Sequence, residues 1–207
     1  MPSSVLRAQN LAFAYPQRRL FQGLSFELLP GVSLLRGGDG SGKTTLLRLM
    51  AGDLPSDGGT LCLGGSSLGE QPAAYRAQVF RVDHQTSDLE QVTAEAQMDA
   101  LSARYPGFDP ARLPALIDGL GLAPHWHKPM YMLSTGSRRK VGLAAAFAAG
   151  AALTLLDEPF AALDQPSIRF VLSLLQAATT DPLRAWVLAD YQAPPGLALA
   201  CVLELPD

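Results

Sequence analysis

Apolar positions in the first third of the chain follow the short periods that are typical of β-strands. We expect strands at residues 5–14, 24–28, 32–36, 60–63 and 79–82. After the buried run that ends at residue 36, Leu46, Leu47 and Met50 share one face of a helix expected at about residues 43–51. Residues 5–82 are therefore expected to be rich in β-strands and to contain one amphipathic helix.

The pattern changes to helical spacing in the middle of the chain. Residues 93–105 are rich in helix formers, and residues 110–120 predict a second helix. We therefore expect an α-helical subdomain at about residues 87–140, inserted into an α/β core of about residues 1–86 and 141–207.

The core pattern resumes after this insertion. We expect helices at residues 144–150 and 166–178, and strands at residues 152–156, 184–189 and 197–205. No linker is long enough to separate independent domains, so residues 1–207 are expected to form a single domain.

Composition and charge exclude several classes of protein. Of 207 residues, 48% are hydrophobic and 17% charged, with a net charge of −3, which leaves no electrostatic case for nucleic acid. Cys62 and Cys201 lie far apart in apolar runs, which favours buried thiols over a disulfide or a metal pair. The longest apolar run, residues 141–156, is shorter than the ~20 residues of a membrane span. We expect a soluble, cytoplasmic chain that reaches a membrane only through a partner.

The strongest chemical signal lies between the strand at residues 32–36 and the helix that follows it. Its sequence, GGDGSGKT, has the form G-x-x-x-x-G-K-T. Glycines let backbone N–H groups surround an anion, Lys43 can reach β- and γ-phosphates, and the Thr44 hydroxyl suits Mg²⁺. We expect nucleotide phosphates here, the alternative being a structural glycine-rich turn. The candidate residues are Gly37, Gly38, Asp39, Gly40, Ser41, Gly42, Lys43, Thr44 and Thr45.

Two acids follow the apolar strand expected at residues 152–156. The carboxyl edge of a parallel sheet is where ligands bind in doubly wound folds. Asp157 would hold Mg²⁺ through water, and Glu158 would polarise an attacking water. The alternative is a strand end that carries solvated acids.

A third candidate is the stretch LSTGS at residues 133–137, which three cations, Arg138, Arg139 and Lys140, follow directly. Cations in the first turn of a helix oppose its macrodipole, so a docked anion would explain them. The alternative is that Ser134 is a plain helix cap.

Together these pieces resemble the nucleotide-binding subunit of an ABC transporter, and the resemblance covers nearly the whole chain. Their order and spacing match the family, which is far more specific than any single motif. The pieces are Tyr15 for the aromatic that stacks on adenine, residues 37–44 for the Walker A loop, Gln85 for the Q-loop glutamine, residues 133–137 for the signature LSGGQ, Leu153–Asp157 for Walker B, Glu158 for the catalytic glutamate and residues 162–164 for the D-loop.

The resemblance implies a fold and a set of ligands. The fold is an α/β P-loop NTPase core with a mixed sheet, an antiparallel β subdomain and the inserted α-helical subdomain. The ligands are ATP and Mg²⁺. The implied catalytic residues are Glu158, Gln85 and Lys43, those at the metal are Thr44, Gln85 and Asp157, and further ATP contacts are Tyr15, Ser134, Gly136 and Asp164. Tyr15 could equally be an ordinary strand aromatic, and Gln85 a solvated glutamine.

The family also implies partners. Two cassettes, as a homodimer or a heterodimer, meet head to tail, so that the signature of one closes on ATP held by the other. The helical insertion is the usual docking region for membrane-spanning subunits. The chain would therefore lie on the inner face of the cell membrane.

Two departures from the family pattern bear on activity. Ser137 replaces the last glutamine of the signature, which is a mild change. Asp190 falls where the family ends its last core strand with a histidine that contacts the γ-phosphate. An ionised carboxylate only accepts hydrogen bonds and repels phosphate. We therefore expect slow hydrolysis, or hydrolysis that depends on a partner cassette, and we expect Asp190→His to raise turnover.

The function that the sequence favours is that of an ATP-hydrolysing transporter subunit, with export favoured by the compact chain. Residues 23–26, His84-Gln85 and residues 156–160 are similar to the short haem-exporter subunits of cytochrome c maturation. The alternative is a hydrolysis-poor module that binds ATP and regulates a partner. A DNA-repair or ribosome-associated cassette is disfavoured, because those carry coiled-coil or tandem-cassette extensions.

Overall fold

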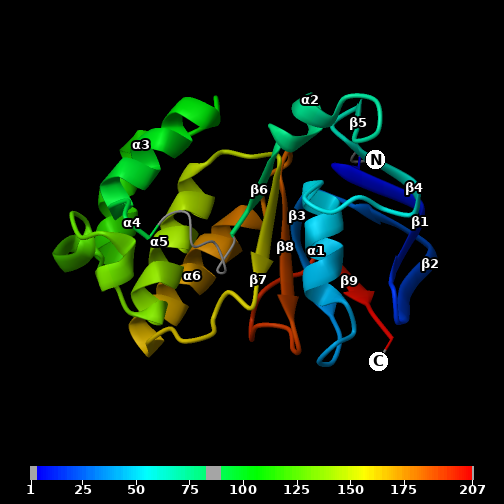
Figure 1. The fold of residues 1–207 in the computed structure, drawn as a ribbon. Coiled ribbons are helices and arrows are strands. Elements are labelled where there is room, and N and C mark those ends of the chain that lie inside the picture. Colours follow the sequence, from blue (N-terminus) through cyan, green and yellow to red (C-terminus); the bar gives the residue numbers. More distant parts are fainter. Residues whose placement is uncertain (1–3, 83–89, 207) are drawn as a thin grey trace. The chain divides into compact units, whose positions relative to one another are not determined.

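The computed structural model describes residues 4–82 and 90–206, which divide into two compact units (Figure 1). The core unit runs to Arg81 and also contains Ala152–Glu158 and the chain from Leu175 onward; the helical unit contains Val82–Ala151 and Pro159–Leu174. The helical unit is larger than the insertion expected at residues 87–140. Compactness alone does not define a subdomain, so the boundaries expected from the sequence stay a prediction.

A five-stranded parallel sheet lies in the core unit (Figure 1). In spatial order its strands are β6 (Val79–Arg81), β7 (Leu153–Asp157), β8 (Ala185–Asp190), β3 (Gly31–Arg36) and β9 (Cys201–Glu204). Strands β3, β7 and β8 are almost wholly buried, as the continuous apolar runs predict. Because the strands are parallel, their carboxyl ends share one edge, where Arg36 pairs with Asp190 and Asp157 pairs with Ala189.

An antiparallel sheet completes the core unit, so the expected combination of a P-loop core and an antiparallel β subdomain is confirmed. Its order is β2 (Arg18–Leu28), β1 (Leu6–Tyr15), β4 (Gly58–Leu63) and β5 (Ser66–Ser67). Strand β2 begins earlier than the expected residue 24. Tyr15 pairs with Arg18 and Phe13 with Phe21, so cross-strand pairing extends the strand through a stretch that lacks clean alternation.

Helix α1 (Lys43–Ala51) forms where the apolar face predicts it. Leu46 and Met50 are fully buried in the core of the unit. The helix ends at Gly52, whose left-handed φ of 72° lets its N–H reach the carbonyls of the last turn. A short helix, α2 (Pro72–Arg76), was not expected from the sequence. The packing of α1 fixes Lys43 at the amino end of the helix, next to the strand-end edge.

In the described part of the helical unit, the chain forms three complete helices and the first part of a fourth. Their bounds are α3 (Ala94–Arg104), α4 (Leu113–Gly119), α5 (Thr135–Ala148) and α6 (Gln165–Ala178), with 3₁₀ turns η2 (Pro110–Arg112), η3 (Ala123–His125) and η4 (Met130–Met132). Helices α3 and α6 lie close to their expected bounds. Helix α5 begins well before residue 144, at Thr135, because Ser134 caps it.

Among residues 4–82 and 90–206, no helix combines the length and apolar character that crossing a membrane requires.

Candidate functional site

The phosphate loop, residues 37–44, joins β3 to α1 with a backbone that favours glycine. Gly40 and Gly42 have φ angles of 75° and 100°, in the left-handed region. A Cβ on Gly42 would lie 3.0 Å from the ring of Phe21. Gly42 directly precedes α1, and the N–H groups at the start of a helix have no partner inside it. This arrangement favours an anion at the amino end of α1.

The Lys43 side chain is held by hydrogen bonds to the backbone of the phosphate loop. Its Nζ donates to the carbonyl oxygens of Gly37 at 2.8 Å and Gly38 at 2.9 Å. The residue is only 7% exposed. A nearly buried ammonium needs such partners, and phosphate oxygens could replace the carbonyls without leaving the charge unpaired.

Thr44 and Asp157 are brought together by the sheet edge. The Thr44 hydroxyl donates to Asp157 Oδ2 at 2.6 Å, and so ties the phosphate loop to the end of β7. These are two of the three side chains expected at the metal. Their oxygens form a donor set of the kind that Mg²⁺ prefers.

Glu158 follows Asp157 with an unusual backbone. Its φ is +44°, in the left-handed region that non-glycine residues rarely adopt. Its N–H donates to the carbonyl of Ala189 on β8 at 2.9 Å, which holds this conformation. The strained backbone turns the chain beyond the strand end, and strain of this kind is concentrated at functional sites.

A cavity of about 330 Å³ adjoins the phosphate loop within the core unit. Its lining contains most of the expected residues of this region, namely Tyr15, Gly38, Asp39, Gly40, Gly42, Lys43, Thr44, Thr45 and Glu158, together with Arg18 and Leu20. The Tyr15 side chain is 42% exposed, and its hydroxyl lies 3.3 Å from Thr45 Oγ1. An aromatic ring open to the cavity is available for stacking, although its role stays a prediction.

Arg18 is a cavity residue that the sequence reasoning missed. Its Nη1 donates to the carbonyl of Gly40 at 3.0 Å, from the hairpin that joins β1 to β2. A cation soon after the strand that carries Tyr15 was the available signal, but the hairpin that turns it toward the phosphate loop was not recognised.

The structure brings Tyr191, the residue after the one expected at the switch position, to the phosphate loop. Asp190 ends β8, and its Oδ1 accepts a hydrogen bond from the backbone N–H of Tyr191 at 2.7 Å. It is Tyr191 that contacts the phosphate loop, through its hydroxyl to Asp39 and through its ring beside Lys43. The first residue beyond the strand, rather than the last within it, reaches over the loop. The assignment of Asp190 to the switch position and the expected slow hydrolysis stay predictions, which the Asp190→His substitution tests.

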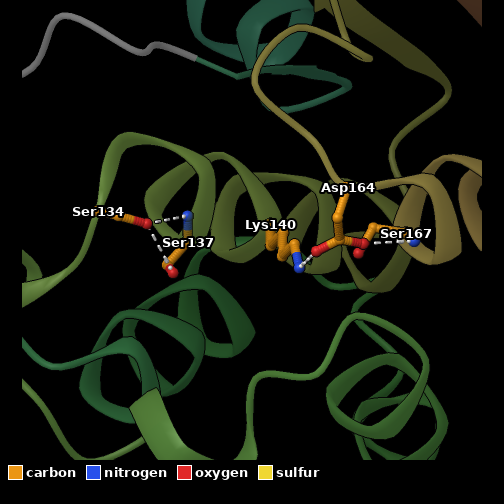
Figure 2. A network of polar contacts seen from close by, with 5 residues as sticks. All are labelled: Ser134, Ser137, Lys140, Asp164 and Ser167. Atoms are coloured by element: carbon orange, nitrogen blue, oxygen red, sulfur yellow. Dashed lines mark hydrogen bonds and ion pairs between the residues drawn. The ribbon is translucent and has the colours of Figure 1, made fainter.

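The signature and D-loop residues lie together within the helical unit (Figure 2). Ser134 Oγ caps α5 by accepting from the N–H of Ser137 at 3.1 Å, and the two hydroxyl oxygens are 3.0 Å apart. Ser137 therefore adds to the cap in the place where the family has glutamine. A Cβ on Gly136 would lie 2.6 Å from the carbonyl oxygen of Ala162, so the two loops pack backbone to backbone.

Asp164 joins the D-loop to helix α5 through Lys140 (Figure 2). Its carboxylate accepts from the Lys140 ammonium, and its Oδ1 accepts from the N–H of Ser167 at 2.9 Å. The hydrogen bond from Lys140, followed by those from Ser167, holds the pKa of Asp164 well below its usual value. Asp164 therefore acts both as a helix cap and as an ion-pair partner.

These contacts weaken the argument for a docked anion, because they give the basic cluster partners within the chain. Lys140 pairs with Asp164, while Arg138 Nε donates to the carbonyl of Leu133 at 3.2 Å and its Nη1 lies 3.9 Å from Glu90 Oε1. Helix α5 also starts at Thr135, so Arg139 and Lys140 lie beyond its first turn. Internal partners already compensate these two cations, Arg138 and Lys140.

Replacing Asp164 by asparagine tests this ion pair. Asparagine is also a good helix cap, so Asp164→Asn removes the charge and keeps the cap. Because the pKa of Asp164 is lowered, the pair stabilises the fold at neutral pH and loses this effect as the pH falls below the usual aspartate value. We expect a lower melting temperature at pH 7 by about 1–3 °C, and a smaller difference near pH 3. Thermal unfolding followed by circular dichroism measures both; equal differences at the two pH values would argue against the pair.

Gln85, expected at the Q-loop, lies outside the described residues. Its role stays a prediction.

Comparison with known proteins gives matches over most of the chain. The family model described as "ABC transporter" matches residues 21–161. The chain is 35% identical over 195 residues to the "Cytochrome c biogenesis ATP-binding export protein CcmA" of Salmonella typhi, an alignment that covers 94% of this chain and 93% of that protein. The protein of the same name from Pseudomonas putida is 37% identical over 164 residues, with coverage of 79% and 78%.

Solved structures share the fold. An ATP-binding subunit of an ABC transporter matches with a TM-score of 0.82 at 23% identity, over 91% of this chain and 80% of that chain. A putative ABC transporter ATP-binding protein from Pyrococcus furiosus matches with a TM-score of 0.78 at 18% identity, over 97% and 96%. At these identities the likeness shows the fold alone.

Proposed function

The chain belongs to the ABC transporter family as an ATP-binding subunit that powers transport through membrane partners, and we propose that it hydrolyses Mg-ATP at the phosphate-loop edge of its core unit. The observation that carries the proposal is the 2.6 Å hydrogen bond between Thr44 and Asp157, beside Glu158 and the cavity. This hydrogen bond supports the proposal because oxygens suited to a metal lie beside the phosphate loop and the Glu158 carboxylate.

Lys43 and the loop backbone would bind the phosphates. In the structure the Lys43 ammonium donates to two loop carbonyls, and ATP would replace these acceptors with β- and γ-phosphate oxygens. The exchange keeps a nearly buried charge hydrogen-bonded throughout. The amino end of α1 adds its partial positive charge at the same place.

Thr44 and Asp157 are the residues that we propose for the metal. Bound Mg²⁺ would neutralise charge on the β- and γ-phosphates. The Thr44 hydroxyl would turn its proton away from Asp157 and offer an oxygen lone pair, while the Asp157 carboxylate accepts hydrogen bonds from a metal-bound water. The hydrogen bond between the two side chains keeps both oxygens at this edge.

Glu158 is the proposed general base. Its carboxylate would accept a proton from the water whose oxygen attacks the γ-phosphorus, while the bond to the bridging oxygen breaks and releases ADP and phosphate. The backbone hydrogen bond to Ala189 fixes the residue relative to β8. This fixed position supports a role in orienting water.

The other end of ATP would lie along the first hairpin. The exposed ring of Tyr15 offers a stacking face for adenine, and Arg18 adds a cation at the same cavity. The hydrogen bond between the Tyr15 and Thr45 hydroxyl groups orients the ring beside the start of α1.

A complete site would need a second cassette. Ser134, Gly136 and Asp164 lie in the helical unit, whereas the phosphate loop lies in the core unit. In the head-to-tail arrangement of the family, these residues face ATP held by the partner. We propose a dimer with a second copy or a related cassette, attached to membrane-spanning subunits at the inner face of the membrane.

The relatives suggest the biological setting. Because proteins named for ATP-binding export in cytochrome c biogenesis align with 79–94% of this chain, we propose that it powers an export step in that process. A second candidate is a hydrolysis-poor module that regulates a partner. The placement of Tyr191 beside Lys43 is the observation that favours it.

Phosphate release as a function of Mg²⁺ concentration tests the proposed function. We expect the purified chain, alone or with its partner, to release phosphate from ATP only with Mg²⁺. Thr44→Val removes the hydroxyl from the proposed metal site. The Mg²⁺ concentration for half-maximal rate should therefore rise by about tenfold. Thr44→Ser keeps the hydroxyl and should behave as the parent chain does.

Valine has nearly the size and shape of threonine, so packing alone does not separate Thr44→Val from the parent chain. If Thr44→Val hydrolysed ATP with the parent's Mg²⁺ requirement, Thr44 would not hold the metal. Nucleotide binding without phosphate release by the parent, with and without its partner, would support the regulatory module.

A further inference from the structure

Asp39 places an acid inside a loop that is otherwise built to attract anions. The loop sequence GGDGSGKT, residues 37–44, has no other acidic residue. The backbone N–H groups of such a loop and the amino end of the helix that follows favour a bound phosphate. An ionised carboxylate carries the same sign of charge as phosphate and has no hydrogen to donate to it. The Asp39 side chain therefore works against the cradle that its backbone helps to form.

The structure places Asp39 at the proposed nucleotide site. Asp39 lines the cavity of about 330 Å³ together with Lys43 and Thr44. The residue is exposed, so packing in the core does not require an acid here. A charge beside a bound nucleotide acts on its phosphates through a medium that is only partly water. The carboxylate is thus close enough to the proposed phosphate site to influence binding.

Tyr191 engages this carboxylate from the next strand of the sheet. Strand β8 ends at Asp190, whose Oδ1 accepts a hydrogen bond from the Tyr191 N–H at 2.7 Å and fixes the turn that follows. From this turn the Tyr191 hydroxyl donates to Asp39 Oδ1. The Tyr191 ring lies beside Lys43, with 4.3 Å between Nζ and the ring centroid. Asp39 is therefore tethered to β8.

The tether persists at neutral pH. The hydrogen bond to Asp39 raises the pKa of Tyr191 to about 12, and desolvation and the charges of Asp39, Glu158 and Asp190 add to the shift. The phenol therefore keeps its proton and can donate to the carboxylate. A hydrogen bond to an ionised acceptor is stronger than one between neutral groups, so it offsets part of the carboxylate charge and fixes its direction.

We propose that Asp39 and Tyr191 form a pair that sets how tightly the loop holds the β-phosphate of a nucleotide. The Asp39 carboxylate repels the phosphate and weakens binding, and the Tyr191 hydroxyl limits that repulsion by holding the carboxylate. Tyr191 is a positioning residue that acts through Asp39. ATP and ADP both place a β-phosphate on the loop, so the pair acts on both, and its hold on ADP favours release of that product. This role rests on the proposed function, since it needs a nucleotide on the loop.

Calorimetric titration with Mg-ADP tests the repulsion, because ADP has no terminal phosphate. Asp39→Asn keeps the size of the side chain and removes its charge. We expect the Kd to fall about fivefold at about 0.05 M salt, and less than about twofold at about 0.5 M salt, where added ions screen the charges. Asp39→Glu keeps the charge and should not lower the Kd. Asp99→Asn, which removes an exposed acid from α3, is the control for net charge and should leave the Kd unchanged.

A double-mutant cycle tests the part of Tyr191. Tyr191→Phe removes the donor and keeps the ring. We expect the Kd for Mg-ADP to rise about threefold in the parent chain, and to change less than about 1.5-fold in a chain that already carries Asp39→Asn. Tyr131→Phe, which alters an exposed tyrosine in the helical unit, should change neither value. Equal losses in both backgrounds would mean that the phenol acts on the nucleotide or the fold directly, and the pair would be rejected.

The remaining outcomes separate this pair from the proposed function. An unchanged or higher Kd in Asp39→Asn, or a decrease that salt does not diminish, would overturn the pair and leave nucleotide binding in place. A parent chain that bound neither Mg-ADP nor Mg-ATP would overturn the proposed function itself. Thermal unfolding verifies that each variant is folded, and Asp39→Ser removes the same charge and takes the place of Asp39→Asn if that variant does not fold.

Discussion

Glu158→Gln is expected to lower the rate of ATP hydrolysis by roughly 100-fold or more, with the affinity for Mg-ATP changed by less than about threefold. The amide keeps the size of the side chain and its hydrogen-bonding ends, but it cannot take a proton from water at neutral pH. The backbone of Glu158, held at φ +44° by Ala189, should accept the change without moving. Phosphate release tests the expected loss of rate, and calorimetry on the same preparation tests the expected affinity for Mg-ATP.

Glu27→Gln is the matched control for this variant. Glu27 is an exposed glutamate on β2 that pairs with Arg7 at 2.8 Å, on the antiparallel sheet. It should leave turnover unchanged. Equal losses of turnover and of ATP affinity in Glu158→Gln would mean that the residue holds the nucleotide or the fold, rather than the attacking water.

Lys43→Ala is expected to weaken Mg-ATP binding by roughly 100-fold and to abolish measurable turnover. The ammonium is nearly buried, so its bonds to phosphate oxygens would form with little competition from water and are worth more than surface contacts. The same change leaves the carbonyls of Gly37 and Gly38 without this donor. Binding is measured by calorimetry with Mg-ATP, and folding by thermal unfolding.

Lys128→Ala removes an exposed lysine from the helical unit and serves as the control for lost charge. It should bind ATP as the parent does. If Lys43→Ala remained folded and bound ATP with the parent's affinity, the phosphate loop would not be the binding site, and the account would fail at its first step.

The sequence predicted the core strands well because short continuous apolar runs are typical of strands in a buried parallel sheet. Strands β3, β7 and β8 are buried on both faces, so the run itself marks the element. The phosphate loop was equally clear, since its glycines and Lys43 are required by local backbone geometry and charge. Both signals depend on residues that are neighbours in the chain.

Features that depend on distant residues were missed or misplaced. The early start of β2 depends on pairing with β1, and Arg18 reaches Gly40 only because that hairpin forms. The basic cluster suggested an anion because its partner, Asp164, lies far along the chain from Lys140. The contacts of Tyr191 with Asp39 and Lys43 were missed, because they join residues that are far apart in the chain.

The most direct test of the central claim is a pull-down of tagged Glu158→Gln chain with Mg-ATP from detergent-solubilised native cells, with partners identified by mass spectrometry. The variant should hold the ATP-bound state, and the same chain with Lys43→Ala added should not. The account predicts a membrane protein with several spanning helices in the eluate, enriched by ATP and reduced by the second substitution. Recovery of soluble partners alone would contradict the account of a transporter subunit.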